Sequence, residues 1–159
     1  MLRAVSFSHQ LIRERLKPGD LAVDATAGNG HDTILLASLT GPDGMVIAFD
    51  VQAEAIAATR TALERSGAPA HSWQLIRAGH ETMAEAVPDA WQGKAGAVLF
   101  NLGYLPGSDK SVTTSTATTL TALAAALRLL RPGGVSVAGL YTGHPGGQEE
   151  ADAVVNFAA

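Results

Sequence analysis

Short apolar runs alternate along the chain with longer segments in which apolar and polar residues mix at helical spacing. The runs predict buried strands, because they are largely apolar and bounded by turn residues: Leu21–Ala25, Met45–Phe49, Trp73–Arg77, Ala95–Phe100 and Val135–Leu140. The other segments predict helices at Ser8–Leu16, Asp32–Leu39, Ala53–Ser66, Thr82–Ala86 and Thr114–Leu130, with a last one that starts near Gly147 and still runs at Ala159. Strands that alternate with helices form right-handed βαβ units. We therefore expect an α/β fold with a doubly wound, mostly parallel, Rossmann-like sheet.

Composition narrows the class of protein. The 159 residues are 47% hydrophobic and 16% charged, as in a globular domain, and there is no cysteine. Thiolate metal sites, disulfides and cysteine nucleophiles are therefore excluded, and we expect no metal site. The net charge of −4 argues against a protein that coats nucleic acid through bulk charge. No apolar run approaches the roughly 18 residues of a membrane span, and the start of the chain lacks the apolar core of a secretory signal, so we expect a cytoplasmic protein.

The loop after the first predicted strand carries the densest motif. Dinucleotide-binding folds favour G-x-G-x-x-G here, and Gly28 and Gly30 supply the first two glycines, but Thr33 stands at the third position. This counts against NAD or FAD. No G-x-x-x-x-G-K-[ST] motif occurs, which excludes a P-loop.

A second pattern fits this loop better. Asp24 ends the first strand and Asp50 ends the second, so both carboxylates should face one crevice that holds no basic residue. One carboxylate could hold an ammonium group and the other both hydroxyls of a ribose. S-adenosylmethionine carries both groups and no phosphate. The alternative is an ordinary turn with an aspartate that caps a helix.

The next two strand ends carry further candidates. After the third strand, His80 could stack on an adenine and Glu81 could bind its edge, or both could belong to a surface turn. After the fourth strand, Asn101 begins a loop that is reminiscent of the Asn-Pro-Pro-aromatic loop of enzymes that methylate amino nitrogens. An amide oxygen there can accept a hydrogen bond from a target amine and orient its lone pair.

In sum, the chain closely resembles the bacterial YtqB/MnmM family. Six motifs in order carry the resemblance over nearly the whole chain: Asp24–Thr33, Phe49–Gln52, Gly79–Glu81, Phe100–Gly107, Asp109-Lys110 and Tyr141–Gly147. The resemblance implies a class I S-adenosylmethionine-dependent methyltransferase, long labelled an rRNA methylase. It further implies N-methylation of 5-aminomethyl-2-thiouridine at the tRNA wobble position.

The resemblance also assigns roles to residues. Cofactor contacts are implied for Gly28, Asn29, Gly30, Asp32, Asp50, Gln52, His80 and Glu81, with Asp24 at the same edge and Asn101 beside the transferred methyl group. Tyr104, Asp109, Tyr141 and His144 are candidates for accepting a proton or lining the pocket, or else turn residues without a role. We regard Asn101, Tyr104 and His144 as the candidate catalytic residues.

Local charge indicates a partner. Basic side chains that could contact phosphates of an anticodon loop are Arg3, Arg13, Arg15, Lys17 and Lys110. A solvated charged face is the alternative. Single-stranded loops are usually bound by stacking on aromatic side chains, a role that would fall to Tyr104 and Tyr141.

Three other functions stay open at this point: a small-molecule methyltransferase of the same fold, an NAD-dependent oxidoreductase, and a domain that keeps the fold without activity. We expect residues 1–159 to form a single domain. Members of the family continue beyond this point, so we expect the chain to be a fragment, or its fifth strand to remain an unpaired edge. Such an edge predicts a homodimer.

Overall fold

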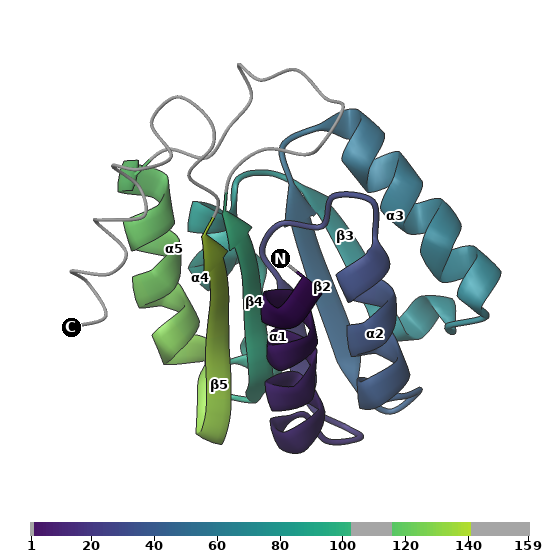
Figure 1. The fold of residues 1–159 in the computed structure, drawn as a ribbon, viewed down its shortest axis with the longest axis horizontal. Helices are drawn as coiled ribbons and strands as arrows, with labels where there is room; N and C mark the ends of the chain where they lie inside the picture. The colour runs from purple at the N-terminus through teal and green to yellow at the C-terminus, as the bar shows by residue number, and fades with distance from the viewer. Residues whose placement is uncertain (1, 103–115, 141–159) are drawn as a thin grey trace.

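The computed structural model describes residues 2–102 and 116–140, which form one five-stranded sheet with helices on both faces (Figure 1). Its elements are α1 (Leu2–Arg15), β1 (Leu21–Asp24), α2 (His31–Thr40), β2 (Met45–Asp50), α3 (Ala53–Ser66), β3 (Trp73–Arg77), α4 (Met83–Ala86), β4 (Ala95–Leu102), α5 (Thr116–Leu129) and β5 (Leu130–Leu140). Short 3₁₀ turns occur at Ala70–Ser72, His80–Thr82 and Asp89–Trp91. The strand order is β3-β2-β1-β4-β5 and every pair is parallel. The predicted doubly wound α/β fold is confirmed.

The apolar strands are buried because helices cover both faces of the sheet. Alternate residues of β1 point to opposite faces. Val23 belongs to the larger apolar cluster, which also contains Met83 of α4 and Leu129 of α5. Ala22 belongs to a second cluster with Ile12 of α1 and Leu36 of α2. The sheet is therefore sandwiched between α1 and α2 on one side and α4 and α5 on the other, with α3 beside α2 (Figure 1).

The strand order places a topological switch point at the centre of the sheet. The chain leaves β1 towards β2 on one side, whereas β4 pairs with β1 on the other. In open α/β sheets ligands bind where neighbouring connections diverge in this way, beyond the carboxyl ends of the strands. The residues that follow β1, β2 and β4 are therefore the ones placed to form a site.

The structure corrects three boundaries. Helix α1 begins at Leu2 and not at Ser8, because nothing upstream of Ser8 breaks a helix. Strand β4 runs to Leu102, so Asn101 lies in the strand and not in a loop. Strand β5 begins at Leu130 and not at Val135.

The third correction has a local cause. Ala95 of β4 pairs with Leu130, while Ala97 pairs with Val135, so the register shifts between the two positions. Pro132-Gly133-Gly134, which follows the predicted helix, lies in this irregular part of the strand, with Gly133 in the left-handed region at φ +83. The helix expected from Gly147 onward lies outside the described residues. Within the described ranges, none of the helices has both the length and the apolar character needed to cross a membrane.

Candidate functional site

The loop between β1 and α2 owes its shape to two glycines. Gly28 and Gly30 adopt left-handed backbone conformations, with φ of 56 and 88. A Cβ on Gly30 would lie 2.9 Å from the Cα of Thr59 in α3, and Thr59 Oγ1 donates a hydrogen bond to the carbonyl of Gly28 at 3.1 Å. The loop is therefore held against α3, and a side chain at position 30 would push the two apart.

Asp24 is fully buried beneath this loop. Its Oδ2 accepts a hydrogen bond from Thr33 Oγ1 at 2.6 Å, and its Oδ1 accepts one from the amide of Thr26 at 3.1 Å. Burial raises the pKa of the Asp24 carboxyl to about 7, reinforced by the neighbouring Asp32 and Asp50 and opposed by the two hydrogen bonds. Asp24 thus supports the loop from below, while its predicted contact with a ligand remains a prediction.

Thr33 stands where a dinucleotide-binding motif would have its third glycine. In this structure the side chain at that position is buried and hydrogen-bonded to Asp24. Helix α2 is thereby anchored to β1 through a polar pair, an arrangement that a glycine could not provide.

Asp50, the last residue of β2, connects the loop to the neighbouring strand. Its Oδ2 accepts a hydrogen bond from the amide of Gly28 at 3.1 Å, and its Oδ1 accepts one from the amide of Gln52 at 2.9 Å. The carboxylate is only half-buried, so each oxygen keeps acceptor capacity for a ligand at the edge of the sheet. Asn29 is exposed at the tip of the loop, and Gln52 is half-buried at the start of α3.

The edge is less uniformly acidic than the sequence indicated. Arg77, the last residue of β3, is paired in register with Asp50. Its side chain is exposed, and its Nε donates to the carbonyl of Val51 at 3.5 Å.

The residues after β3 divide into one buried and one accessible side chain. His80 is 4% exposed, and its ring meets that of Phe100 edge-to-face with centroids 5.6 Å apart. This packing favours a structural role over stacking on a ligand. The half-buried Glu81 folds its carboxylate back over Gly79, where a side chain would collide with it. Glu81 is therefore the better candidate of the two for a polar contact.

Asn101 is held at the carboxyl end of β4 by two hydrogen bonds. Its backbone N–H donates to Thr26 Oγ1 at 2.7 Å, and its side-chain Nδ2 donates to Asp32 Oδ2 at 2.7 Å. The other oxygen of Asp32 accepts a hydrogen bond from His9 Nε2 of α1 at 2.8 Å. The structure thus joins Asn101 directly to Asp32, a residue that the sequence predicted only as a cofactor contact.

The contribution of His9 to the site was not predicted from the sequence. It precedes the buried Ile12 by three positions and Leu16 by seven, so helical spacing already places it on the face of α1 that packs against the sheet. That spacing is the signal that could have identified it.

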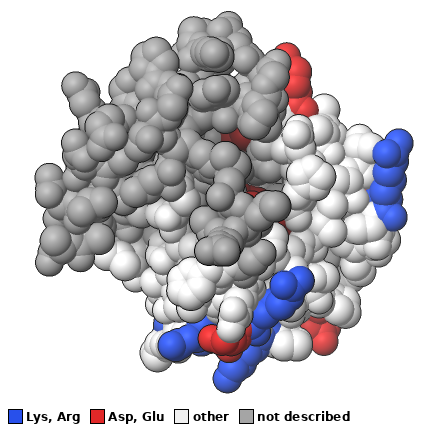
Figure 2. Space-filling model, viewed as in Figure 1, with Lys and Arg blue, Asp and Glu red and all other residues white. Residues whose placement is uncertain are grey.

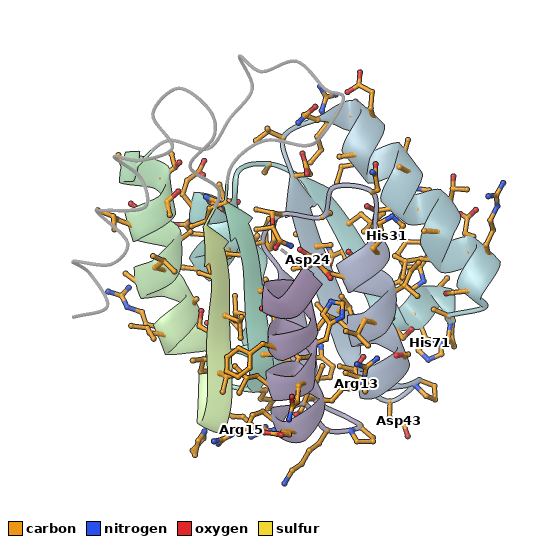
Figure 3. The ribbon with its side chains drawn as sticks, viewed as in Figure 1. Arg13, Arg15, Asp24, His31, Asp43 and His71 are labelled. Carbon is orange, nitrogen blue, oxygen red and sulfur yellow. The ribbon has the colours of Figure 1, made fainter. Side chains whose placement is uncertain are left out.

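Other candidates are not brought to this edge. Figure 3 shows Arg13 and Arg15 at the far end of α1, away from Asp24 and His31, and Figure 2 shows Lys and Arg side chains gathered at that same lower end. The side chain of Arg15 is also engaged locally, because its Nη1 donates a hydrogen bond to the carbonyl of Gly133 at 3.5 Å. Tyr104, Asp109, Lys110, Tyr141 and His144 lie outside the described residues, as does the side chain of Arg3.

Comparison with known proteins gives one consistent result. A protein-family model described as "Putative rRNA methylase" matches residues 46–159. A crystal structure titled as a putative rRNA-methylase from Clostridium thermocellum is 41% identical, with a TM-score of 0.91 over 98% of this chain and 81% of that one. A putative methyltransferase from Streptococcus mutans, solved in complex with SAH (S-adenosylhomocysteine), is 40% identical, with a TM-score of 0.84 over 97% of this chain and 80% of that one.

A curated plant protein is also similar. The chain is 38% identical, over 98% of its length, to the Arabidopsis thaliana protein named "tRNA (mnm(5)s(2)U34)-methyltransferase, chloroplastic". It spans 58% of that protein's length. The family model covers well over half of the chain, and the crystal structures share both its fold and about two-fifths of its residues. The chain therefore belongs to the family described as "Putative rRNA methylase".

Proposed function

We propose that residues 1–159 form a single S-adenosylmethionine-dependent methyltransferase domain that methylates an amino nitrogen of RNA. The observation that carries the proposal is the pairing of Asp50 with the Gly28 loop at the switch point of the sheet. A relative with the same fold and 40% identity was solved with SAH, the product left when S-adenosylmethionine gives up its methyl group.

The residues at this edge fit such a cofactor. Asp50 retains acceptor capacity for the two ribose hydroxyls, and the left-handed turns at Gly28 and Gly30 let the backbone approach a ligand closely. Asp24 supports this loop from below, and we propose Asn29 at its tip, Gln52 after β2 and Glu81 after β3 as further cofactor contacts. The described part of this edge has neither a P-loop lysine nor the three glycines of a G-x-G-x-x-G motif, which would bind a pyrophosphate. Thr33 stands at the third glycine position and anchors α2 to β1. This disfavours the oxidoreductase alternative.

Asn101 is the residue we propose to face the methyl acceptor. When bound, the cofactor supplies an electrophilic methyl carbon whose bond to sulfur breaks, with both electrons left on sulfur, as the amine nitrogen bonds to that carbon. The amine must present a free lone pair, and an amide oxygen can orient it by accepting one of its N–H groups. Asn101 can do this because one N–H of its Nδ2 is held by Asp32, and no donor among the described residues bonds its Oδ1.

The finer assignment follows the curated relative. We propose that the acceptor is the aminomethyl nitrogen of 5-aminomethyl-2-thiouridine at the wobble position of tRNA, and that the anticodon loop of tRNA is the partner. The name of the Arabidopsis protein supports tRNA, whereas the description of the family points to rRNA. A small-molecule acceptor is the remaining alternative.

Transfer of a labelled methyl group distinguishes these acceptors. The chain is incubated with methyl-labelled S-adenosylmethionine and, in parallel, tRNA from a strain that lacks the modification, ribosomal RNA from the same strain, and a panel of small primary amines. Label in tRNA alone supports the proposal. Label only in ribosomal RNA or in free amines would replace the proposed acceptor, and no label in any of the three would contradict methyltransferase activity.

A further inference from the structure

We infer that His9 is a positioning residue for the methyl-acceptor site: through Asp32 it fixes which end of the Asn101 side-chain amide faces the acceptor. This inference rests on the proposed function. It is carried by the chain of hydrogen bonds from His9 Nε2 to Asp32 Oδ1, 2.8 Å, and from Asn101 Nδ2 to Asp32 Oδ2, 2.7 Å.

The carboxylate of Asp32 determines the direction of both hydrogen bonds, that with His9 and that with Asn101. An ionised carboxylate only accepts hydrogen bonds, so both His9 Nε2 and Asn101 Nδ2 must donate to Asp32. The oxygen and nitrogen of an amide lie on opposite sides of the same carbon. With Nδ2 held at Asp32, Oδ1 of Asn101 is turned away from Asp32, and it accepts no hydrogen bond from the part of the chain that the structure describes.

The opposite orientation of the Asn101 side-chain amide would not support methyl transfer. A half-turn about the last bond of Asn101 would place its NH₂ group where the amide oxygen stands. A donor facing an amine cannot accept one of the amine's N–H groups, and would compete for the lone pair that must attack the methyl carbon. The anchoring of Asn101 by Asp32 therefore selects the productive orientation.

His9 keeps Asp32 in place for this purpose. Asp32 stands in the first turn of α2, and its carboxylate would be free to rotate if Asn101 were its only partner. His9 is held by α1, whose Ile12 and Leu16 are buried in the core. The two side chains are only 26% and 23% exposed, so water competes weakly for the hydrogen bond between them. Both oxygens of Asp32 are engaged in this way, so its carboxylate links α1 to the end of β4.

Two variants of His9 separate loss of the hydrogen bond from loss of the ring. His9→Leu removes the donor and keeps apolar bulk, whereas His9→Gln restores an N–H donor at a similar reach. His71→Gln is the matched control, because the exposed His71 hydrogen-bonds the carbonyl of Pro42, 2.9 Å away, and lies away from Asp24 in Figure 3. Each variant is measured for kcat and KM of methyl transfer and for the affinity of S-adenosylhomocysteine by calorimetry.

We expect His9→Leu to lower kcat roughly tenfold or more, since the acceptor loses its alignment. The affinity for S-adenosylhomocysteine should stay within about twofold, and His9→Gln should recover most of kcat while His71→Gln matches the wild type. An unchanged kcat in His9→Leu would overturn the inference. An equal loss in both His9 variants would assign His9 to packing and would also overturn it.

A second readout does not depend on activity. The chain has only three asparagines, Asn29, Asn101 and Asn156, so selective nitrogen-15 labelling of asparagine resolves the side-chain NH₂ signals. The Asn101 pair should shift in His9→Leu and stay in place in His9→Gln and His71→Gln. If the wild type neither binds S-adenosylhomocysteine nor transfers methyl groups, the proposed function fails, and this spectrum still decides whether His9 positions Asn101. An unmoved Asn101 pair in His9→Leu would overturn the inference.

Discussion

The hydroxyl of Thr33 donates a 2.6 Å hydrogen bond to the fully buried carboxylate of Asp24. This pair joins the first turn of α2 to the last residue of β1, directly beneath the glycine loop. It explains why a threonine occupies the position at which a dinucleotide-binding protein needs a glycine. It also places an ionisable group in the core, with a pKa raised to about 7 by burial.

Asp24→Asn should change how stability depends on pH. Because the folded-state pKa lies above the ordinary value of 3.8, the folded protein keeps this proton over a pH range in which the unfolded chain has released it. The contribution of Asp24 to stability is therefore fully present below about pH 4 and is lost as pH rises towards 7, by up to about 4 kcal/mol. Asparagine keeps a neutral group of the same shape and should lack this loss.

The measurement is urea denaturation of both proteins at about pH 5 and about pH 8. Wild-type protein should lose stability relative to the asparagine variant between the two values. Ionisable groups that do not interact with Asp24 are common to both proteins and cancel in the comparison. Parallel profiles would show that Asp24 does not titrate in this range in the folded state.

Asp50→Ala should weaken cofactor binding. The carboxylate is expected to hold both ribose hydroxyls, and loss of a charged hydrogen-bonding partner costs roughly 1.5–3 kcal/mol, or about tenfold or more in affinity. Calorimetry with S-adenosylhomocysteine measures this effect. Asp43→Ala is the matched control, because Asp43 lies in an exposed turn away from Asp24 in Figure 3. Equal affinities in the wild type and Asp50→Ala would remove the ribose role.

Asn101→Ala should separate catalysis from binding. The backbone N–H of residue 101 still reaches Thr26 in this variant, so only the side-chain hydrogen bond to Asp32 is lost. We expect the rate of methyl transfer to fall roughly tenfold to a hundredfold, with cofactor affinity within a few-fold of wild type. Comparable losses in rate and in affinity would reassign Asn101 to cofactor binding.

Arg131 should contribute to the attachment of β5. Its Nε and Nη2 donate to the two oxygens of Asp20 at 3.0 and 2.7 Å, next to the hydrogen bond from Nη2 to the carbonyl of Arg15. Burial alone would raise the pKa of Asp20, but the hydrogen bonds from Arg131 and from the amide of Lys17 outweigh it and hold that pKa below its ordinary value. The contribution is thus present above about pH 4 and is lost as pH falls through the lowered pKa.

A double-mutant cycle of Arg131→Gln and Asp20→Asn tests this pairing. Each single variant should lose about 1–3 kcal/mol at neutral pH, and the double variant should lose less than the sum. Strictly additive losses would show that the two side chains stabilise the fold independently.

The architecture and part of the site could be predicted from the sequence, because they depend on local patterns. Features that depend on contacts between distant residues could not. The strands are nearly continuous apolar runs, so their positions along the chain and the position of Asp50 at the end of β2 could be predicted from local patterns. The bulge in β5 could not, because Pro132-Gly133-Gly134 indicates only the end of a helix, and the pairing of Leu130 with Ala95 depends on β4. The burial of His80 depends on contact with Phe100, which is distant in sequence.

The partnership of His9, Asp32 and Asn101 escaped prediction for the same reason. Three different elements contribute these side chains, and only the packing of α1 against the sheet brings them together. Among the described strands, β5 (Leu130–Leu140) pairs only with β4. The homodimer expected from such an edge stays a prediction, which light scattering can test.

The central claim is tested most directly by nucleoside mass spectrometry of tRNA. Transfer RNA from a strain that lacks the wobble modification is incubated with S-adenosylmethionine and either the wild-type chain or Asn101→Ala, then digested to nucleosides. We predict that the wild type converts 5-aminomethyl-2-thiouridine into its 5-methylaminomethyl form, and that Asn101→Ala does so far more slowly. Persistence of the unmethylated nucleoside with a wild-type chain that binds S-adenosylhomocysteine, or conversion at the same rate by Asn101→Ala, would contradict it.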